Sequence, residues 1–400
     1  MQATANRPPA RLVLGAVLIL GLVAAVYYQR RGERFAGSAG GGDGAKDSPA
    51  VVAPGGEAKQ LPGGVAVQVG APEDAPDRND PALRRERLRL AEERLQTYRA
   101  WAQYPPGSRP ARENPDQLHP RDPVVRGIPL SLSGQPSEHI GLKLRQDRVA
   151  VVGDEAIQLG IRCEDSQGQV LPCAVESAQL SALPTDGEPP KGQRPVSFTA
   201  DKTPEHEGEL VATVRPLELQ LVDRTWPLRV DVKLRAGSDP VEQGSALFDF
   251  LFTPEPPAVT TGKIREAVVD GSLVLYYGLQ VRRPGRYVLH ARVDDSQGKT
   301  FALLEWNDLL AVGPQEVKLV LFGKLLLDEH PSMPLKLRDF DGFLLKEGVD
   351  PDREHLPPRS GYHYTTQVYP SSAFSAKEWQ SDERTRHERE FEHDVEDARK

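Results

Sequence analysis

The sequence predicts a mostly β protein, in which two tandem immunoglobulin-like β-sandwich modules follow an N-terminal transmembrane helix, a flexible linker and a short helical stem. Three observations support this prediction. Short apolar runs that alternate with polar residues recur between residues 136 and 347, as in strands with one buried face. No helical periodicity separates these runs, which favours a sandwich over a parallel sheet. Helical patterns are confined to an N-terminal apolar run, the stem and a charged C-terminal segment.

The N-terminal apolar run is Leu12–Tyr28, LVLGAVLILGLVAAVYY, and it predicts a single-pass transmembrane anchor. Residues 1–11 form a short flank before it. A cleaved signal peptide is the alternative, but the run ends in tyrosines and arginines instead of the small residues of a cleavage site. Arg11 before the run and the arginines of residues 30–34 after it nearly balance, so charge alone leaves the membrane orientation open.

The overall charge gives no indication of a nucleic-acid partner. Lys and Arg total 50 against 58 Asp and Glu, a net charge of −8, and no segment is strongly basic. Residues 29–79 are rich in Gly, Pro, Ala and charged side chains, which cannot bury much apolar surface. This segment is predicted to be a flexible linker.

A helical stem is predicted for residues 80–104. Asp80 is a suitable N-cap, and Pro81 is a suitable first helical residue. Apolar residues on one face recur at intervals of three or four; they are Leu88, Ala91, Leu95, Tyr98 and Ala102. We expect this helix to pack on the first module, with a pairing helix as the alternative. Residues 105–135 predict a Pro-rich extended segment.

Residues 136–255 predict the first sandwich and residues 256–347 the second, with the Pro-rich stretch Thr253–Pro257 between them. The same four residues, Asp-Ser-Gln-Gly, follow a predicted strand in each module, at Asp165–Gly168 and Asp295–Gly298. These residue types are typical of turns, so the sequence predicts two hairpin turns. Duplicated modules would produce this repeat, and so would convergence on good turn residues.

One strand of the second module has a clear buried face. Within Tyr287–Val293 the residues Tyr287, Leu289, Ala291 and Val293 share one side, which alternation predicts to be buried. Pro284-Gly-Arg-Tyr287 is similar to a tyrosine corner, in which the hydroxyl binds nearby backbone.

The two cysteines predict a disulfide. Cys163 and Cys173 lie on either side of the first Asp-Ser-Gln-Gly turn, and a hairpin would place them opposite each other within bonding distance. A disulfide would indicate a cell-envelope location outside the cytosol. Two buried free thiols are the alternative.

The last segment, residues 348–400, is predicted to be an extended tail with a charged helix. Ser375-Ala-Lys-Glu378 fits a capping box that opens this helix, which would run to about Ala398. Its apolar residues are too few for a continuous stripe, which favours a solvated helix. Whether this helix packs or is free stays open.

The sequence predicts no enzyme, because it contains no catalytic, cofactor-binding or metal-binding motif. Asp339 and Asp341 could offer carboxylates to Ca²⁺, but a polar turn is favoured because a calcium loop supplies more oxygen ligands. His387 and His393 lie among glutamates, which a solvated helix explains without a metal. Trp306 is a possible ligand platform for a sugar if it is exposed, with core packing as the default.

The second module resembles a known family. Pro284–Val293, Phe301–Leu304, Leu321–Asp328 and Pro334–Phe343 are similar to the choice-of-anchor X domain of exported proteins of myxobacteria and related bacteria. The segment Tyr104–Pro110 resembles the region that leads into such domains. Residues 140–252 resemble bacterial immunoglobulin-like modules more loosely. The resemblance implies an exported β-sandwich held at the envelope by an anchor, here N-terminal, and it brings no catalytic residues.

Together these features predict a bacterial cell-envelope protein that is anchored in the inner membrane by Leu12–Tyr28, with its folded part in the periplasm. The expected role is protein–protein interaction or structural support, with another envelope protein as partner. The alternative is a module that recognises or processes a surface glycan or peptide, for which an exposed Trp306 would be the platform.

Overall fold

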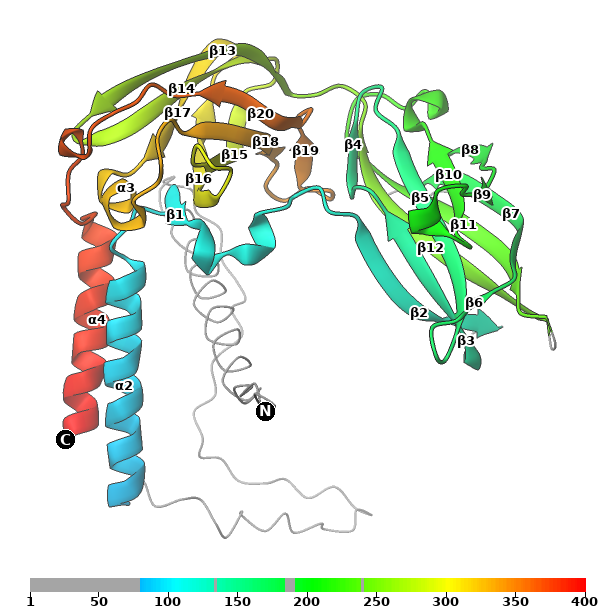
Figure 1. Cartoon of the computed structure of the whole chain (residues 1–400), viewed down its shortest axis with the longest axis horizontal. Helices are drawn as coiled ribbons and strands as arrows, with labels where there is room; N and C mark the ends of the chain where they lie inside the picture. Colours follow the sequence, from blue (N-terminus) through cyan, green and yellow to red (C-terminus); the bar gives the residue numbers. More distant parts are fainter. Residues whose placement is uncertain (1–79, 133–134, 184–190, 239–240) are drawn as a thin grey trace, which may run out of the picture. The chain divides into compact units, whose positions relative to one another are not determined.

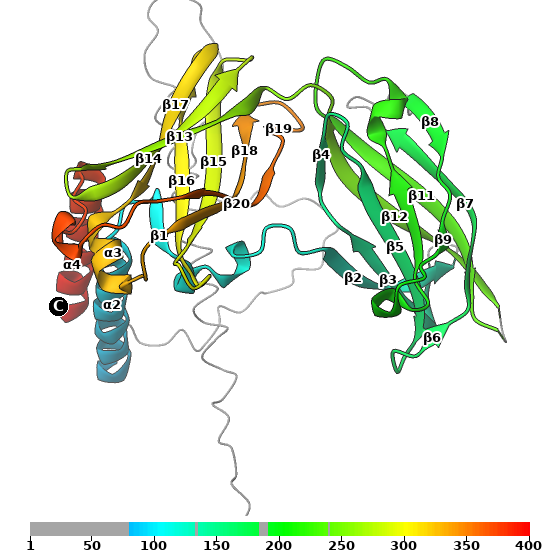
Figure 2. The ribbon, with the colours of Figure 1, turned by 45° about the horizontal axis from the view of Figure 1, so that its top comes forward.

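The computed structural model describes residues 80–132, 135–183, 191–238 and 241–400. The predicted anchor at residues 12–28 and the predicted linker at residues 29–79 lie outside these ranges. Among the described residues, no helix combines the length and apolar character needed to cross a bilayer. The described part is mostly β, with antiparallel sheets in two modules and three α-helices (Figures 1 and 2).

The first module contains eleven strands in one hydrogen-bonded order, β8-β7-β11-β12-β2-β3-β5-β10-β9, with β4 beside β12 and β6 beside β5. One register pair, Ser131 with Ser245, joins its two halves, β8-β7-β11-β12 and β2-β3-β5-β10-β9, between which the core lies. The strands are β2 (Val124–Leu132), β3 (Gln135–Gln146), β4 (Ala150–Val152), β5 (Ile157–Asp165), β6 (Val170–Leu171), β7 (Cys173–Ala182), β8 (Lys191–Pro195), β9 (Thr199–Ala200), β10 (Leu210–Val214), β11 (Trp226–Ala236) and β12 (Glu242–Thr253).

Apolar and polar residues alternate along these strands, and the apolar side faces the core. In β11, Leu228, Val230, Val232 and Leu234 are at most 1% exposed, while the polar residues between them are more accessible. Phe248 in β12 continues the same pattern on the neighbouring strand. The predicted β-sandwich pattern is therefore present in this module.

The second module is formed by two sheets, one with the order β1-β16-β15-β18-β19 and β20 beside β18, the other with the order β13-β14-β17. Its elements are β1 (Ser108–Pro110), β13 (Ala258–Val269), β14 (Ser272–Val281), β15 (Gly285–Asp294), β16 (Thr300–Leu310), β17 (Gly313–Leu321), α3 (Gly323–Glu329), β18 (Lys336–Leu345), β19 (Arg353–His355) and β20 (Arg359–Thr365).

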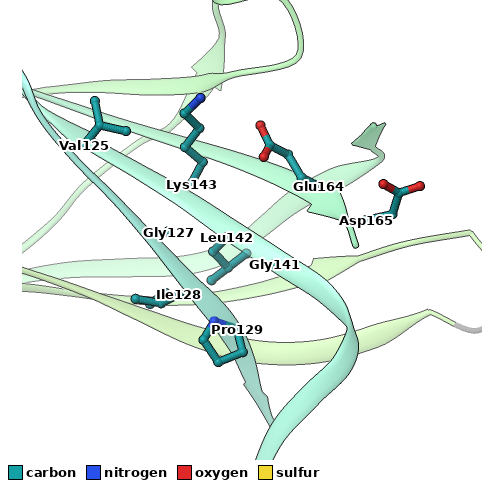
Figure 3. A pocket seen from close by; sticks show the side chains of 9 residues that line it. All are labelled: Val125, Gly127, Ile128, Pro129, Gly141, Leu142, Lys143, Glu164 and Asp165. Carbon is teal, nitrogen blue, oxygen red and sulfur yellow. The ribbon is translucent and has the colours of Figure 1, made fainter. Parts of the chain in front are cut away.

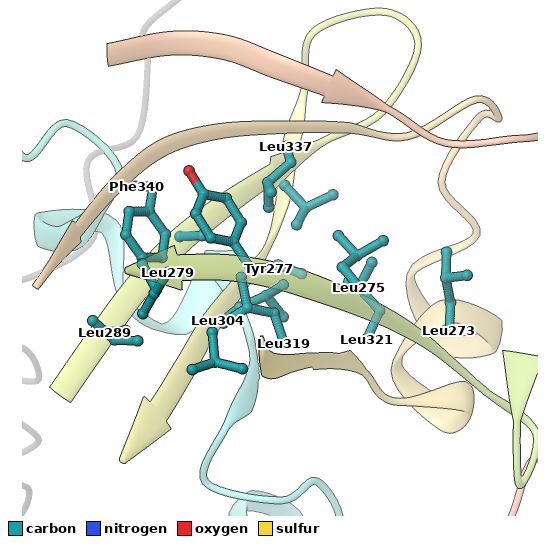
Figure 4. Packing of buried hydrophobic residues seen from close by; sticks show 14 of the residues in the cluster. Leu273, Leu275, Tyr277, Leu279, Leu289, Leu304, Leu319, Leu321, Leu337 and Phe340 are labelled. Carbon is teal, nitrogen blue, oxygen red and sulfur yellow. The ribbon is translucent and has the colours of Figure 1, made fainter. Parts of the chain in front are cut away.

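The core of the second module lies between these two sheets (Figure 4). Tyr277 of β14 stacks on Phe340 of β18, with ring centroids 4.1 Å apart. Leu275 of β14 and Leu289 of β15 are fully buried beside this pair. Stacked rings and interdigitated aliphatic side chains hold the two sheets together through apolar burial.

The strand β1 precedes the first module in sequence but belongs to the second. Ser108 of β1 lies opposite Leu304 of β16, and the buried Tyr104 donates its hydroxyl to Asp328 at 2.8 Å. The first module is therefore an insertion between β1 and β13. The predicted extended segment, residues 105–135, contains β1 and most of β2, and two short 3₁₀ turns, Ala111–Glu113 and Pro115–Gln117, interrupt it.

Two arginines of the second module hold the segment that leads into the insertion. Arg292 of β15 donates to the carbonyl of Gln117 at 2.9 Å, and Arg338 of β18 donates to the carbonyl of Leu118 at 3.1 Å. Charge-assisted bonds to backbone explain why this Pro-rich stretch follows a defined path over the sheet.

The segment after residue 347 is also more structured than predicted. Within it, β19 and β20 both pair with β18, where Phe343 lies opposite His355 and Leu337 lies opposite Tyr364. These edge strands are mostly accessible, so their sequences lack the alternation that reveals a strand with one buried face.

Helices α2 (Pro81–Trp101) and α4 (Asp382–Arg399) each begin after an N-cap residue whose side chain accepts a hydrogen bond from a backbone amide of the first turn. The Asp80 side chain accepts a bond from the amide of Ala82 at 2.8 Å, as the stem prediction requires. The predicted start of the tail helix at Ser375 was wrong, because the N-cap is Ser381. Acidic residues follow Ser381 directly, and they favour the positive end of a helix. Ser375 instead donates its amide to the carbonyl of Gly271.

The two helices lie side by side and antiparallel (Figure 1). Tyr98 of α2 packs on Phe391 of α4 with ring centroids 5.1 Å apart. Arg99 pairs with Glu392, and Arg399 near the other end of α4 pairs with Glu92. The helix predicted to pack on the first module therefore pairs with α4, and the tail helix is packed, not free.

The predicted tyrosine corner is confirmed. The Tyr287 hydroxyl donates to the carbonyl of Arg283 at 2.6 Å, and it also lies 3.1 Å from the carbonyl of Pro257. This side chain is fully buried, and burial raises the pKa of its hydroxyl. It links the start of β15 to the chain that enters β13.

Replacing Tyr287 with Phe is expected to cost about 1–2 kcal/mol of unfolding free energy, because a buried hydrogen bond is lost while the ring is kept. Calorimetry of the full chain should show a lower midpoint for the transition of the second module. An unchanged midpoint would mean that the hydroxyl contributes nothing to stability.

Both Asp-Ser-Gln-Gly segments form the predicted turns with the same hydrogen bonds. Asp165 accepts the amide of Gly168 on its carbonyl, and its carboxylate accepts the amides of Gln167 and Gln169. Asp295 makes the corresponding bonds in the second module. The final glycines have φ of +80° and +85°, a conformation that other residues adopt at a cost.

Replacing Gly168 or Gly298 with Ala is expected to destabilise each turn by about 1–2 kcal/mol, because alanine is strained at this φ. No atom lies closer than 3.6 Å to an added Cβ at either site, so the cost is conformational. Asn tolerates this φ and serves as the control, with a smaller expected loss. Equal losses for Ala and Asn in thermal melts would contradict this explanation.

Candidate functional site

The predicted disulfide between Cys163 and Cys173 is present, with the two Cα atoms 5.7 Å apart. Its geometry differs from the hairpin that suggested it, because the residue opposite Cys163 is Leu171 of β6. Cys173 begins β7 and lies opposite Ala236 of β11, in the other half of the sandwich. The bond therefore joins two strands of different halves, and Cys163 is fully buried.

Strand β2 of the first module is largely exposed. It pairs with β3 along its length, but with β12 only at Ser131. Every residue from Arg121 to Pro129 is exposed, and three of them are aliphatic; Val124, Val125 and Ile128 are 37%, 48% and 36% exposed. Among the described residues, no backbone bond pairs residues 124–129 with any segment except β3. This part of β2 is an open sheet edge.

A shallow hollow of about 450 Å³ lies beside this edge, on β2, β3 and β5 (Figure 3). Two glycines that have no side chain to fill it, Gly127 and Gly141, contribute to its lining. Lys143 of β3 and Glu164 of β5 lie on its rim, where Figure 3 shows their charged ends directed away from the strands. The hollow is thus an open surface with an apolar floor and a mixed polar rim.

Hydrogen bonding to an extended segment is the chemistry that this arrangement offers. The free edge has backbone groups that can extend the sheet by one strand, and the hollow can take a side chain of that strand. Sequence analysis missed β2, because a strand exposed on both faces has no alternation. The sequence signal available was Val124-Val-Arg-Gly-Ile128, in which three of five residues are β-branched.

A cluster of potential metal ligands, Asp201, His206 and Glu209, was not predicted. One ligand atom of each lies within 4.8 Å of the others, and it is the one such group in the described ranges. Both oxygens of Glu209, however, accept bonds from Arg145, at 2.8–3.2 Å. A guanidinium in this position disfavours a cation, so the cluster is better described as an ion-pair network.

The two aspartates considered as calcium ligands, Asp339 and Asp341, accept hydrogen bonds from arginine side chains. Arg338 and the amide of Gly361 donate to Asp339, while Arg292 donates to Asp341, which also lies 3.0 Å from Nδ1 of His290. Burial alone would raise the pKa of both carboxyls, but these neighbours outweigh it and leave each pKa below its ordinary value. Asp339 therefore ties β18 to β20, and Asp341 ties β18 to β15.

Trp306 lies opposite Leu289 on the core-facing side of its sheet, half-buried against the apolar core of the second module. That position leaves only part of the ring accessible to a ligand. His387 and His393 lie on α4, where His387 contacts Tyr98 and His393 pairs with Asp397.

Comparisons with known proteins show no close relative. No protein-family model matches the chain, and no curated protein matches it. A crystal structure of a DUF4785 family protein from Legionella pneumophila is similar at 12% identity and TM-score 0.37, with 57% of this chain and 56% of that chain covered.

Two larger proteins show weaker similarity. Trypsin-activated alpha-2-macroglobulin from Escherichia coli has 14% identity and TM-score 0.20, with 55% of this chain and 16% of that chain covered. Dimeric latent PorU from Porphyromonas gingivalis has 13% identity and TM-score 0.18, with 60% and 20% covered. The chain thus spans less than two thirds of each of these three structures, and at these TM-scores none of them supports a functional argument.

Proposed function

We propose that this chain is a membrane-anchored cell-envelope protein whose β-sandwich modules bind another envelope protein without catalysing a reaction. The observation that carries the proposal is the open edge of β2, with Val124, Val125 and Ile128 accessible beside the hollow. An exposed strand edge is a template for pairing, and natural proteins usually protect it when it has no partner.

The proposed location is the bacterial inner membrane, with the modules in the periplasm. The disulfide between Cys163 and Cys173 supports an oxidising compartment. The apolar run Leu12–Tyr28 supports an anchor, and the resemblance of the second module to choice-of-anchor X domains supports export. A glycan-binding role receives less support, because Trp306 is half-buried against the core.

The binding mode that fits this surface is strand addition. A partner strand would pair with the backbone of residues 124–129 and place alternate side chains toward the hollow and toward Val124 and Ile128. Main-chain hydrogen bonds would then supply most of the affinity, and the hollow would select the side chain that enters it.

The interaction is tested by replacing Val125 with Asp, which places a charge at the edge without disturbing the core. The full chain, cross-linked in cells and purified, is expected to lose its stoichiometric envelope partner in this variant. Leu309 is 72% exposed on the second module, and its replacement with Asp is the matched control that should keep the partner. Recovery of the same partner by both variants, at unchanged melting temperature, would overturn the assignment to β2.

The location is tested by protease treatment of intact and outer-membrane-permeabilised cells, with the redox state of the cysteines read from the same samples. We expect the C-terminus to be protected in intact cells and cleaved after permeabilisation, with Cys163 and Cys173 oxidised. Continued protection with both thiols reduced would place the folded part in the cytosol and refute the envelope location.

A further inference from the structure

Three cations lie close together beside the open edge of β2, on the outer face of the first module, which is the face of β3 and β5 turned away from the core. Lys143 of β3 lies directly opposite Arg162 of β5, and Arg145 lies two residues further along β3. Like charges directly opposite each other in a sheet are destabilising. Carboxylates near these three side chains therefore stabilise the outer face.

Two carboxylates lie among these cations, and each is bound to an arginine. Both oxygens of Glu209 accept bonds from Arg145, at 2.8–3.2 Å. Glu164 accepts a bond from Nε of Arg162 at 2.6 Å. Neither carboxylate is thus available to Lys143 without breaking an ion pair that the structure already contains.

Lys143 is the cation that has no such partner. It is exposed, and no hydrogen bond or ion pair joins its ammonium group to any residue that the structure describes. Its charged end points away from the strands at the hollow (Figure 3). Asp165 also lines the hollow, but its carboxylate accepts the amides of Gln167 and Gln169 in its own turn. The hollow therefore offers an unpaired positive charge to whatever binds at the edge.

Gly127 leaves the way from this charge to the open edge free. It lies opposite Lys143 in the pair of β2 with β3, and a Cβ added to it would meet no described atom within 4 Å. A strand added to the free side of β2 would lie two strand spacings from β3, which is about 9–10 Å. Lys143 has a flexible four-carbon stem, so its ammonium group can reach over Gly127 to a carboxylate on the added strand.

A second copy of β2 does not supply this carboxylate. In an antiparallel pair of identical strands about a twofold axis, the residue opposite Gly127 must also point to the outer face. On β2 and the residues just before it, the outer-face positions are the odd-numbered ones; they are Arg121, Pro123, Val125, Gly127, Pro129 and Ser131. None of these is acidic, so self-pairing would leave Lys143 unpaired, which favours a strand of a different protein.

We infer that the strand added to β2 belongs to a partner protein and has a glutamate or aspartate opposite Gly127, whose carboxylate pairs with Lys143. This inference rests on the strand addition proposed above and names the side chain that the hollow selects. An accessible ion pair adds little affinity, but a like charge at the same place repels the wrong strand. Lys143 is thus a specificity-determining residue, and it also fixes the register of the added strand.

Carbodiimide cross-linking tests this contact, because it joins an amine to a carboxylate that touches it. Membranes that contain the full chain are treated with carbodiimide, and the joined peptides are identified by mass spectrometry. We expect an amide between Lys143 and a glutamate or aspartate of the partner. Lys233, which is exposed on β11, is the control lysine that should form none. Lys143→Arg should keep the partner and lose this amide, because a guanidinium keeps the charge without the reactive amine.

Charge reversal measures the selectivity. Lys143→Glu is expected to lower the yield of co-purified partner at least tenfold at a melting temperature that does not fall, whereas Lys233→Glu should leave the yield unchanged. A lysine in place of the mapped partner carboxylate should restore binding to the Lys143→Glu chain. Such a rescue depends on the pairing of the two charges and not on either side chain alone.

The outcomes distinguish this inference from the proposed function. Loss of the partner in Val125→Asp with full recovery in Lys143→Glu would overturn the inference and leave the edge of β2 as the binding site. Full recovery in both variants would overturn the proposed function as well. An amide from Lys143 only to Glu164 of its own chain, or to a second copy of the chain, would also overturn the inference, as would the absence of any amide between Lys143 and the partner.

Discussion

Replacing Arg145 with Met is expected to lower the unfolding free energy of the first module by about 3–5 kcal/mol. Arg145 and Glu209 form an ion pair whose side chains are only 13% and 7% exposed. Without the guanidinium, the carboxylate of Glu209 stays in a poorly solvated position, with the imidazole of His206, 3.2 Å away, as its remaining side-chain neighbour. Urea unfolding, followed by hydrogen exchange in peptides from β3 and β5, measures the loss.

The double variant Arg145→Met with Glu209→Ala distinguishes two causes of this stability loss, an unpaired carboxylate at Glu209 and the lost packing of the Arg145 side chain. We expect it to be at least about 2 kcal/mol more stable than the Arg145 single variant, because no unpaired charge remains. A double variant as unstable as the single one would contradict this explanation and assign the loss to packing of the arginine stem.

A nearby glycine provides an independent check. Gly160 lies opposite Arg145 in the sheet, and a Cβ added there would meet Oε1 of Glu209 at 1.8 Å. Gly160→Ala should therefore displace Glu209 and destabilise the wild-type chain by about 1–3 kcal/mol. In the double variant the carboxylate is gone, and the same substitution should cost much less, which is the non-additivity expected of contacting residues.

Much of the fold could be predicted because period-two alternation records which face of a strand is buried. The rule identified β11 and β15, in which every second residue is buried, and residue types alone predicted the turns at Asp165 and Asp295. It could not identify β2, which is exposed on both faces, or β13, whose residues are mostly accessible at the edge of its sheet.

Long-range pairing was the second limit. Ser108 of β1 lies opposite Leu304, and no local pattern in a three-residue strand indicates a partner so far along the chain. The stripe on α2 predicted a buried face but not its partner. A charge comparison would have suggested α4, since α2 has six arginines and three glutamates, whereas α4 has eight carboxylates and four arginines.

The candidate site depends on register more than on sequence motifs. The hollow exists because Gly127 and Gly141 lie on neighbouring strands and leave space on the same face. A glycine in one strand indicates nothing of its neighbour until the pairing of β2 with β3 is known. The same limit applied to the cysteines, for which proximity was correctly predicted while the strands that they join were not.

Removal of the disulfide is expected to lower the unfolding free energy of the first module by nearly as much as the Arg145→Met substitution. The Cys163→Ala, Cys173→Ala variant should unfold its first module with about 3 kcal/mol less free energy, because a closed loop of about ten residues no longer restricts the unfolded chain. Alanine is chosen because serine would place a hydroxyl at the fully buried position 163. Hydrogen exchange should show the loss in β5, β7 and β11, with the second module unchanged.

Dithiothreitol supplies the matched control for this prediction. Reduction should destabilise the wild-type first module by the same amount and leave the alanine variant unaffected, so that the two treatments converge on one stability. A wild-type midpoint that does not move on complete reduction would mean that the sandwich core alone holds its two halves together. In that case the pair Cys163–Cys173 would report on the compartment of the protein without contributing to its stability, and the short crossing from β6 to β7 would be held by apolar contacts such as that of Leu171 with the core.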